Sequence, residues 1–392
     1  MKIVILGAGR AGLAAALCLE KRFQNYQDIA ITLVDRHDYH LLNDKLFGVA
    51  TSDEELADIQ KLKSATVLPI REVFSGKAVK FVQGEVLEID ARKNRVHLHR
   101  HWLEYDYLVL ALGDVPNFSS AKGAQEYGLP LRSLADALRI RNALGFLVET
   151  RRLRQSQSPI RIAVAGGGEK GVEFAAELKN CLDFLAWKNG FPKEDLEIAV
   201  YEAQLRLLPR FDYRLSQSAF WRLKQLGVGV ELEKKVISVD RHFLVFQNGE
   251  KIQYDMLVWT AGSVPAKTAI LQGHFLKAAS GDLLVNEHLQ LKDNPNIFVI
   301  GRQAGIESAA YNPGQQAEYL AYALPRFVRN RRPMAYQPKR PSLILKIGPR
   351  WAIADLSFGS FTGYFGYFIC QLSHFNYLCR LLGFRKALKF WF

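Results

Sequence analysis

Cysteine is scarce in this sequence of 392 residues, which contains only Cys18, Cys181, Cys370 and Cys379. Four cysteines are too few for the disulfide framework of a small secreted protein, so we expect the chain to work in a reducing compartment. They are also far apart along the sequence and form no Cys-x-x-Cys motif. The sequence therefore argues against chemistry that needs a close redox pair of cysteines.

Acidic residues are in deficit, because 39 Asp and Glu face 52 Lys and Arg, which leaves a net charge of +13. This excess suits anionic cofactors or an anionic membrane surface. The basic residues are mostly scattered and no nucleic-acid-binding motif accompanies them, so we expect no nucleic-acid partner. A hydrophobic share of 49% excludes a mainly disordered protein.

Long unbroken apolar runs are missing as well. The nearest candidate, residues 356–379, contains no Asp, Glu, Lys or Arg, but glycines and polar residues interrupt it. Basic and aromatic residues then alternate to the end, and a single helix from Tyr377 would place six apolar side chains on one face. These are Tyr377, Leu381, Phe384, Leu388, Trp391 and Phe392. The pattern predicts an amphipathic helix that lies on a membrane surface without crossing it.

The chain opens with a strand, a glycine-rich turn and a helix. Residues 2–6 form a short apolar run, as in a parallel strand covered on both faces, and this run is no signal peptide. The turn Gly7-Ala8-Gly9-Arg10-Ala11-Gly12 follows, and residues 13–21 have a helical pattern. This order is typical of a dinucleotide-binding βαβ unit.

Each glycine of this turn has a physical role. Gly7 allows the tight bend, Gly9 lets a diphosphate approach the backbone, and Gly12 permits close packing of helix on strand. The diphosphate then lies at the positive end of the helix. Asp35, at the end of the next predicted strand, is placed to bind ribose hydroxyls.

The same order recurs in the middle of the chain. A strand over 161–165 leads into Gly166-Gly167-Gly168-Glu169-Lys170-Gly171, and a strand over 196–201 ends at Glu202. Glu202 follows its turn at a longer distance than Asp35 does, so we expect residues 180–194 to be an insertion. A carboxylate at this place favours NADH over NADPH, because it binds a free 2′-hydroxyl and repels a 2′-phosphate.

Two dinucleotide-binding turns in one chain imply hydride transfer between two cofactors. Because two nicotinamides offer little useful chemistry, we expect FAD at the first turn and NADH at the second. The sequence thus predicts an α/β fold with two Rossmann-like dinucleotide-binding domains followed by C-terminal amphipathic helices. The predicted units are an FAD-binding domain (1–116 and 263–330), an NADH-binding domain (117–262) and a C-terminal membrane-anchoring region (331–392). Without a cysteine pair, the electron acceptor should be diffusible, and the C-terminal pattern suggests one dissolved in the membrane.

In these features the chain resembles the type II NADH:quinone oxidoreductases, monotopic flavoproteins with two dinucleotide-binding domains. The resemblance extends over nearly the whole chain, and its segments are 34–36, 40–42, 105–113, 128–141, 171–174, 200–203, 207–209, 261–262, 296–301, 315–321 and 383–385. It implies an enzyme that passes two electrons from NADH through FAD to a quinone, without ion pumping. It also implies a peripheral membrane protein on the cytoplasmic, reducing face, and allows a homodimer.

The resemblance implies the site residues too. Glu173 would supply protons or position substrate, while Tyr311 and Gln315 would border the quinone. The residues that would hold FAD are Gly7, Ala8, Gly9, Arg10, Ala11, Gly12, Asp35, Arg36, Val86, Ala111, Gly113, Gly301 and Arg302. Those that would hold NADH are Gly166, Gly168, Gly171, Glu202 and Gly262. No metal site is expected.

Three positions depart from the family pattern. Arg302 stands where the family usually has an aspartate that binds the flavin ribityl chain, and Tyr311 replaces the first glutamine of the quinone motif. Asn43-Asp44-Lys45 replaces the usual Gln-Pro-Leu. Two other functions therefore stay open: a flavin-dependent NAD(P)H oxidoreductase with a non-quinone acceptor, and a nucleotide-binding redox-regulatory protein with weakened catalysis.

Overall fold

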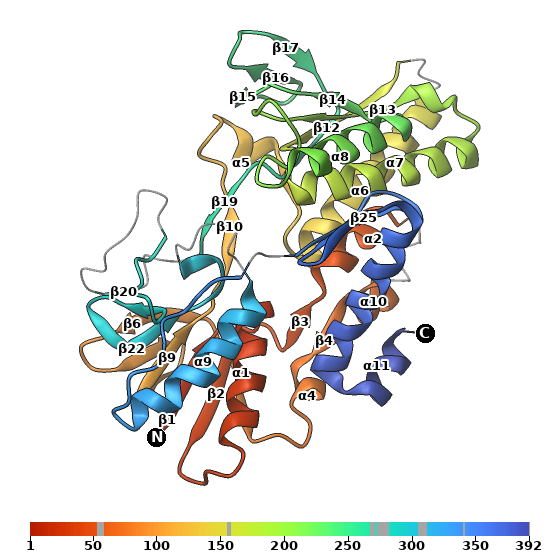
Figure 1. The fold of residues 1–392 in the computed structure, drawn as a ribbon. Coiled ribbons are helices and arrows are strands. Elements are labelled where there is room, and N and C mark those ends of the chain that lie inside the picture. The colour runs from red at the N-terminus through yellow and green to blue at the C-terminus, as the bar shows by residue number, and fades with distance from the viewer. Residues whose placement is uncertain are drawn as a thin grey trace.

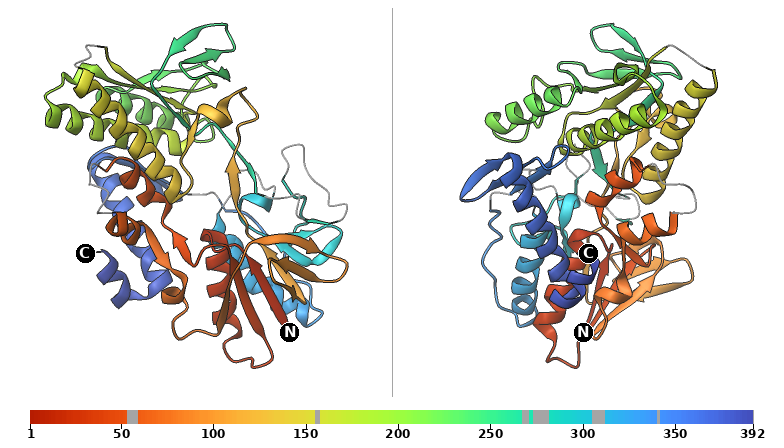
Figure 2. Two further views of the ribbon diagram at one scale, coloured as in Figure 1. Left: turned by 180° about the vertical axis from the view of Figure 1, so that it is seen from behind. Right: turned by 90° about the vertical axis from the view of Figure 1, so that its right-hand side faces the viewer.

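The computed structural model describes residues 1–52, 59–154, 158–266, 271–272, 282–304, 312–339 and 342–391. Two α/β units lie one above the other in Figure 1, and the C-terminal helices lie beside both of them. The views of Figure 2 show the same arrangement from behind and from the side. The predicted fold class, with two Rossmann-like units followed by C-terminal helices, is confirmed.

The lower unit is built on a six-stranded sheet with the order β21-β22-β9-β1-β2-β5. Its strands are β1 (Lys2–Leu6), β2 (Ala30–Asp35), β5 (Val79–Gln83), β9 (Tyr107–Leu110), β21 (Gln290–Leu291) and β22 (Asn294–Val299). All neighbours except β21 and β22 pair in parallel, and the central strands are apolar because both faces are covered. Helices α1 (Arg10–Phe23) and α9 (Pro313–Val328) cover one face, and a smaller sheet covers the other. That smaller sheet consists of β6 (Val86–Asp90), β7 (Arg95–Leu98), β8 (His101–Glu104) and β20 (Leu271–Gln272).

The upper unit repeats this three-layer plan around the parallel sheet β11-β18-β12-β13-β14. The strands are β11 (Leu129–Pro130), β12 (Ile160–Ala165), β13 (Leu196–Tyr201), β14 (Gly229–Glu231) and β18 (Met256–Trp259). Helices α6 (Leu134–Arg154), α7 (Glu169–Asn189) and α8 (Tyr213–Gln225) pack on one face. The antiparallel strands β15 (Val236–Val239), β16 (Phe243–Phe246) and β17 (Lys251–Gln253) pack on the other, beside the short helix α5 (Ala124–Tyr127).

The prediction that residues 180–194 form an insertion is wrong, because most of them belong to helix α7. Helix α7 continues without a break to Asn189, and Gly190 ends it in the left-handed conformation with φ +69°. A 3-10 turn (Lys193–Asp195) then leads directly into β13. The additional residues between the glycine turn and Glu202 therefore lengthen the helix, and no extra structure is inserted.

Two antiparallel strands connect the units. The chain leaves the lower unit through β10 (Asp114–Pro116) and returns through β19 (Ser263–Pro265), which pair with each other. Trp259 stabilises this connection, because its indole N–H donates a hydrogen bond of 2.8 Å to the backbone carbonyl of Asn117.

The C-terminal region packs against a side excursion of the lower unit. This excursion comprises β3 (Tyr39–Leu41), a 3-10 turn (Asn43–Lys45), α2 (Leu46–Ala50), α3 (Ile59–Thr66), β4 (Val67–Pro69) and α4 (Ile70–Val73). The C-terminal strands β23 (Leu343–Lys346), β24 (Ala352–Leu356) and β25 (Gly359–Thr362) form an antiparallel sheet. Helices α10 (Gly363–Leu382) and α11 (Phe384–Trp391) follow.

The prediction of one continuous amphipathic face from Tyr377 onward is wrong. Gly383, with φ +77°, separates α10 from α11, and α11 folds back so that Ala387 is buried with Leu378 of α10. Tyr377 hydrogen-bonds to His40, and Leu381 is only 3% exposed in the core of the lower unit. Phe384, in contrast, is 65% exposed. Phe392 lies outside the described residues.

The packing of α10 generates a prediction about stability. Leu381→Ala should lower the free energy of unfolding by about 2–4 kcal/mol, because it leaves a cavity in the core. Phe384→Ala, its control on the exposed surface, should change this free energy by no more than about 0.5 kcal/mol. Urea denaturation of both variants measures the difference. Equal effects would mean that the tail does not pack as described.

Candidate functional site

The first glycine turn is shaped by contacts that exclude side chains at two of its three glycines. Gly7 has φ +102°, and a Cβ there would lie 2.4 Å from the carbonyl oxygen of Ala111. A Cβ on Gly12 would lie 1.8 Å from the carbonyl oxygen of Gly7. At Gly9, by contrast, a Cβ would meet no described atom within 4 Å. Space is therefore open above the N-terminus of α1, where the diphosphate of a dinucleotide fits.

Asp35 is fastened to this turn. One carboxylate oxygen accepts a hydrogen bond of 2.6 Å from the backbone N–H of Ala8, and the other accepts one of 2.9 Å from His37. The carboxylate is thus fixed beside the turn, and its remaining lone pairs can accept bonds from ribose hydroxyls.

The second turn repeats these contacts. Gly166 has φ +106°, and a Cβ on Gly171 would lie 1.9 Å from the carbonyl oxygen of Gly166, whereas a Cβ on Gly168 would meet no described atom within 4 Å. Glu202 is 8% exposed and accepts a hydrogen bond of 2.6 Å from the backbone N–H of Gly167. The two turns therefore have the same construction.

A third part of the first site comes from the end of β22. Gly301, with φ +79°, begins a 3-10 turn (Gly301–Ala304) beside Ala11, and its backbone N–H donates to the side chain of Gln316 at 2.6 Å. Gln316 is fully buried, and its amide nitrogen has no hydrogen-bond partner among the described residues. An unused buried donor beside a glycine turn fits a polar group of a bound cofactor.

Charged side chains gather where the chain crosses between the units. Asp114 forms an ion pair with Arg132. Burial acts to raise the pKa of Asp114, but this ion pair and a hydrogen bond from Ser263 outweigh burial and lower the pKa. Lys170, within the second glycine turn, belongs to the same cluster. Burial, aided by Arg132, lowers the pKa of Lys170 to about 8.

Glu173 connects the second turn with the C-terminal sheet. It lies on the first turns of α7, and its carboxylate accepts a hydrogen bond from the backbone N–H of Lys346 in β23. Burial raises the pKa of Glu173 to about 8, and the negative charge of Asp44 acts in the same direction. Glu173 can therefore hold a proton near neutral pH and release it.

Helix α10 turns a polar stripe towards these residues. Cys370, His374 and Tyr377 follow one another at helical spacing on one side of the helix. The hydroxyl of Tyr377 lies 2.7 Å from Nε2 of His40, and Nδ1 of His40 lies 2.9 Å from the carbonyl oxygen of Ala8. Burial lowers the pKa of His40 to about 4, so the neutral ring donates from Nδ1 and accepts at Nε2. Helix α10 is thereby connected to the first glycine turn.

A second contact of this stripe is the pair of Asp44 and His374, whose carboxylate oxygen and Nδ1 are 2.5 Å apart. Burial acts to raise the pKa of Asp44, but the hydrogen bond and charge of His374, with the charge of Arg10, hold it below its usual value. The other carboxylate oxygen of Asp44 is buried without a hydrogen-bond partner among the described residues. Asp44 and Glu173 interact electrostatically, so the two turns and α10 converge on one cluster.

Residues 1–317 match the pyridine nucleotide-disulphide oxidoreductase family. The chain belongs to this family. A probable NADH dehydrogenase of Dictyostelium discoideum is 24% identical over 99% of this chain and 87% of its own length. A type II NADH:quinone oxidoreductase of Staphylococcus aureus is 27% identical over 76% of this chain and 73% of its own length.

Solved structures agree with the fold. NDH2 from Plasmodium falciparum, solved in complex with NADH, has a TM-score of 0.83 at 20% identity and covers 100% of this chain and 97% of its own. The sulfide:quinone oxidoreductase of Aquifex aeolicus has a TM-score of 0.77 at 17% identity and covers 98% of this chain and 92% of its own. At these identities the likeness shows a common fold.

The family's name refers to a disulphide, but the four cysteines of this chain form no disulfide bond. All four lie in the described part of the chain, and no disulfide joins any of them. Cys18 lies on α1, Cys181 on α7, and Cys370 and Cys379 on α10, so no two form a close motif in the sequence. Burial raises the pKa of Cys370 to about 11, which keeps this thiol protonated.

The predicted site residues lie in several parts of the structure. Ala8, Arg10 and Ala11 lie in the first glycine turn with Asp35 beside them, and Glu202 lies beside the second turn. The residues that follow strand ends near these turns are Ala111, Gly113, Gly262, Gly301 and Arg302. Gln315 lies at the start of α9, where its side chain accepts a hydrogen bond from the backbone of Lys339. Arg36 is exposed, and Val86 is buried at the start of β6. Tyr311 lies outside the described residues.

Sequence reasoning missed His40, Asp44, Gln316 and His374 as site residues. The substitution of Asn43-Asp44-Lys45 for the usual family residues was a usable signal for Asp44. Nothing in the sequence signals that His374 is the partner of Asp44, because most of the chain lies between these two residues.

The space above Gly9 generates a prediction. Gly9→Val should abolish retention of FAD while the fold remains, because the new side chain enters only the space for the diphosphate. Gly12→Ala should instead destabilise the fold, because its Cβ would collide with the backbone of Gly7. Flavin absorbance and circular dichroism of the purified variants separate the two effects. A Gly9→Val protein that retains stoichiometric FAD would contradict the assignment of this site.

Proposed function

We propose that this chain is an FAD-dependent NADH:quinone oxidoreductase that works at a membrane surface without pumping ions. The observation that carries the proposal is the convergence of both dinucleotide turns and helix α10 on one cluster. His40 connects the first turn to Tyr377, and Glu173, beside the second turn, interacts with Asp44. This network would connect a donor site, a cofactor site and an acceptor side.

FAD and NADH are the cofactors that suit the two turns. We assign FAD to the unit of residues 1–116 and 263–330, and NADH to residues 117–262. Bound FAD supplies hydride acceptance from NADH and two-electron delivery to an acceptor. The chain's own residues orient the cofactors: Asp35 and Glu202 are each fixed by a backbone N–H, where they can accept bonds from ribose hydroxyls. Glu202 would also repel a 2′-phosphate, which favours NADH.

Arg302 and Gly301 begin the segment that would approach the flavin from β22. Arg302 cannot accept a hydrogen bond from a ribityl hydroxyl as an aspartate would, but its guanidinium can pair with the FAD diphosphate. The buried amide of Gln316 supplies a further donor on this side. These residues fit FAD without the usual aspartate.

A quinone is the acceptor that the chain's features favour. The chain offers no close cysteine motif for a disulfide or sulfide reaction, and the curated relatives are named NADH dehydrogenase and type II NADH:quinone oxidoreductase. On the acceptor side, Gln315 would border the quinone, and Glu173 would hold a proton for it. Dioxygen is the alternative acceptor that an experiment has to exclude.

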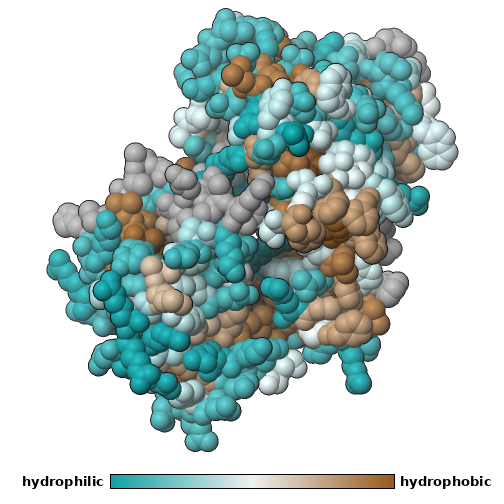
Figure 3. Space-filling view, viewed as in Figure 1, coloured by the Kyte–Doolittle hydropathy of each residue, from teal (hydrophilic) through white to brown (hydrophobic). Residues whose placement is uncertain are grey.

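The outer face of α10 supports attachment to a membrane. Tyr364, Phe365, Phe368 and Leu372 are all more than half exposed on this face. Figure 3 shows a brown apolar patch over the C-terminal helices, in contrast to the teal surface of the lower unit. Among the described residues, no helix combines the length and apolarity that a bilayer span requires. We propose a peripheral attachment on the cytoplasmic, reducing face; a homodimer stays a prediction.

Stopped-flow spectroscopy tests the catalytic proposal in two halves. Anaerobic NADH should bleach the flavin absorbance, and NADPH should do so with a kcat/KM lower by about tenfold or more, which corresponds to about 1.4 kcal/mol. A water-soluble quinone should then restore the absorbance faster than air-saturated buffer does. Absence of bleaching would favour the regulatory alternative, and faster reoxidation by oxygen would favour a non-quinone acceptor.

Membrane attachment has its own test, which uses exposed residues and leaves the packed side of α10 intact. The triple variant Phe365→Ser, Phe368→Ser, Leu372→Ser should lose most sedimentation with anionic liposomes, because it removes apolar contact area. It should keep NADH oxidation with a water-soluble quinone. A matched control replaces Phe146 on α6, which is 71% exposed, with Ser. Equal liposome binding by the triple variant and the wild type would refute attachment through α10.

A further inference from the structure

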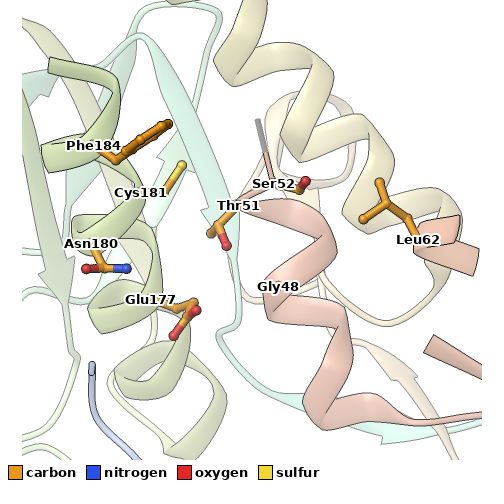
Figure 4. Close-up of a pocket in the computed structure, with 8 residues that line it drawn as sticks. All are labelled: Gly48, Thr51, Ser52, Leu62, Glu177, Asn180, Cys181 and Phe184. Atoms are coloured by element: carbon orange, nitrogen blue, oxygen red, sulfur yellow. The ribbon is translucent and has the colours of Figure 1, made fainter. Parts of the chain in front are cut away.

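A groove between helices α2 and α7 lies beside the network around Glu173. It has a volume of about 470 Å³ and is lined by Gly48, Thr51, Ser52, Leu62, Glu177, Asn180, Cys181 and Phe184. In Figure 4 the side chains of Glu177 and Thr51 lie between the two helices, with Glu177 below Thr51. Gly48, Asn180 and Phe184 are exposed, so water has access to the groove.

Glu177 is the acidic residue of this groove and one turn of helix beyond Glu173. Residues four apart on a helix lie on the same face, so the two carboxylates are neighbours along α7. Glu177 forms an ion pair with Lys346, with 3.1 Å between Oε2 and Nζ. The backbone N–H of Lys346 in turn donates to Glu173. Lys346 therefore holds both carboxylates, one through its side chain and the other through its backbone.

Reduction of a quinone requires a proton from water. NADH delivers a hydride, which carries two electrons and one hydrogen nucleus, so that NADH, a quinone and one solvent proton yield NAD⁺ and a quinol. The titratable residues that interact electrostatically with the side chain of Glu173 are Asp44, Lys170, Glu177, Lys346 and Cys370. The charges of Asp44, Glu177 and Lys346 change the pKa of Glu173, and the charge of Glu173 raises the pKa of Lys170 and of Cys370. Among these, Glu177 is the carboxylate that lines a groove open to water.

We propose that the groove between α2 and α7 is the entrance for this solvent proton, and that Glu177 passes the proton to Glu173. The inference rests on the proposed function, because only an acceptor that takes up protons requires such a route. Water in the groove protonates the Glu177 carboxylate; its O–H bond then breaks as an O–H bond forms on Glu173, which gave its own proton to the reduced acceptor. The ammonium group of Lys346 holds Glu177 in place and balances the negative charge of the deprotonated Glu177 carboxylate.

The charges around Glu173 predict opposite pH effects for two variants. Glu173 can donate only while protonated, so acceptor reduction should fall as the pH rises through its pKa of about 8. Glu177→Gln removes a negative charge that raises this pKa, so the alkaline limb should move to lower pH. Lys346→Met removes a positive charge that lowers it, so the limb should move to higher pH. Each shift is read from the pH at which the rate of reoxidation falls to half of its plateau.

The test measures the two half-reactions of the FAD-loaded protein separately by stopped flow. Glu177→Gln should slow quinone-dependent reoxidation about fivefold or more at pH 8.5 and increase its solvent isotope effect, because proton delivery becomes limiting. NADH-driven bleaching should keep its wild-type rate. Glu177→Asp, which restores a carboxylate, should recover most of the rate, and added acetate should partly rescue Glu177→Gln through the open groove.

Asp183→Asn is the matched control. Asp183 lies on the same helix in an ion pair of 2.7 Å with Lys179, and its side chain is partly exposed, as that of Glu177 is, but it does not line this groove. It should change neither the rate nor the pH profile. Wild-type reoxidation rates in Glu177→Gln, or an equal slowing in the Asp183→Asn control, would overturn the proton entrance. If quinone fails to reoxidise the wild-type flavin, the proposed function itself is wrong, so the two failures are distinguishable.

Discussion

Helix α10 is held against the lower unit by two polar contacts, and the arrangement of the site depends on them. Tyr377 bonds to His40, which bonds to the carbonyl of Ala8 in the first glycine turn, and His374 pairs with Asp44. Because the intervening groups are buried or half-buried, an unpaired member of either contact would carry a desolvation cost. The same helix exposes large apolar side chains on its outer face. One element thus connects the cofactor turn to the surface from which a membrane-dissolved acceptor would arrive.

The two dinucleotide turns use one construction twice. In each, a carboxylate at the end of the second strand accepts the backbone N–H of the residue after the first glycine. The last glycine of each turn has no room for a Cβ, whereas the middle one borders open space. The packing of the helix on the strand leaves no room for a side chain at the last glycine. The open space beside the middle glycine leaves a place for a ligand. The glycines of one motif therefore serve two different physical needs.

The cluster around Glu173 is built differently, from side chains contributed by three distant parts of the chain. Asp44 comes from the excursion after β3, Glu173 from α7 and His374 from α10. Burial, with the charge of Asp44, raises the pKa of Glu173 to about 8. Burial acts to raise the pKa of Asp44 too, but the hydrogen bond and charge of His374 hold it below its usual value. Two carboxylates in one cluster with pKa values pushed apart can take different roles, one as proton carrier and one as fixed charge. Asp44, which stands at one of the departures from the family pattern, belongs to this cluster.

The sequence by itself determined both βαβ units, the strand-end carboxylates and the fold class, because these depend on spacings within a few tens of residues. It also singled out Glu173 after the second turn, whose role in catalysis stays a prediction. It could not decide that residues 180–189 extend a helix, since a helical pattern and an insertion are compatible with the same gap. Only the tertiary structure decided which side of α10 faces inward. Leu381 is buried and Tyr377 is hydrogen-bonded on that side, whereas Phe365 and Phe368 of the same helix lie exposed. The pairs of Asp44 with His374 and of Lys346 with Glu177 join residues remote in the sequence, and such contacts are fixed by the packing of whole elements, which no local pattern encodes.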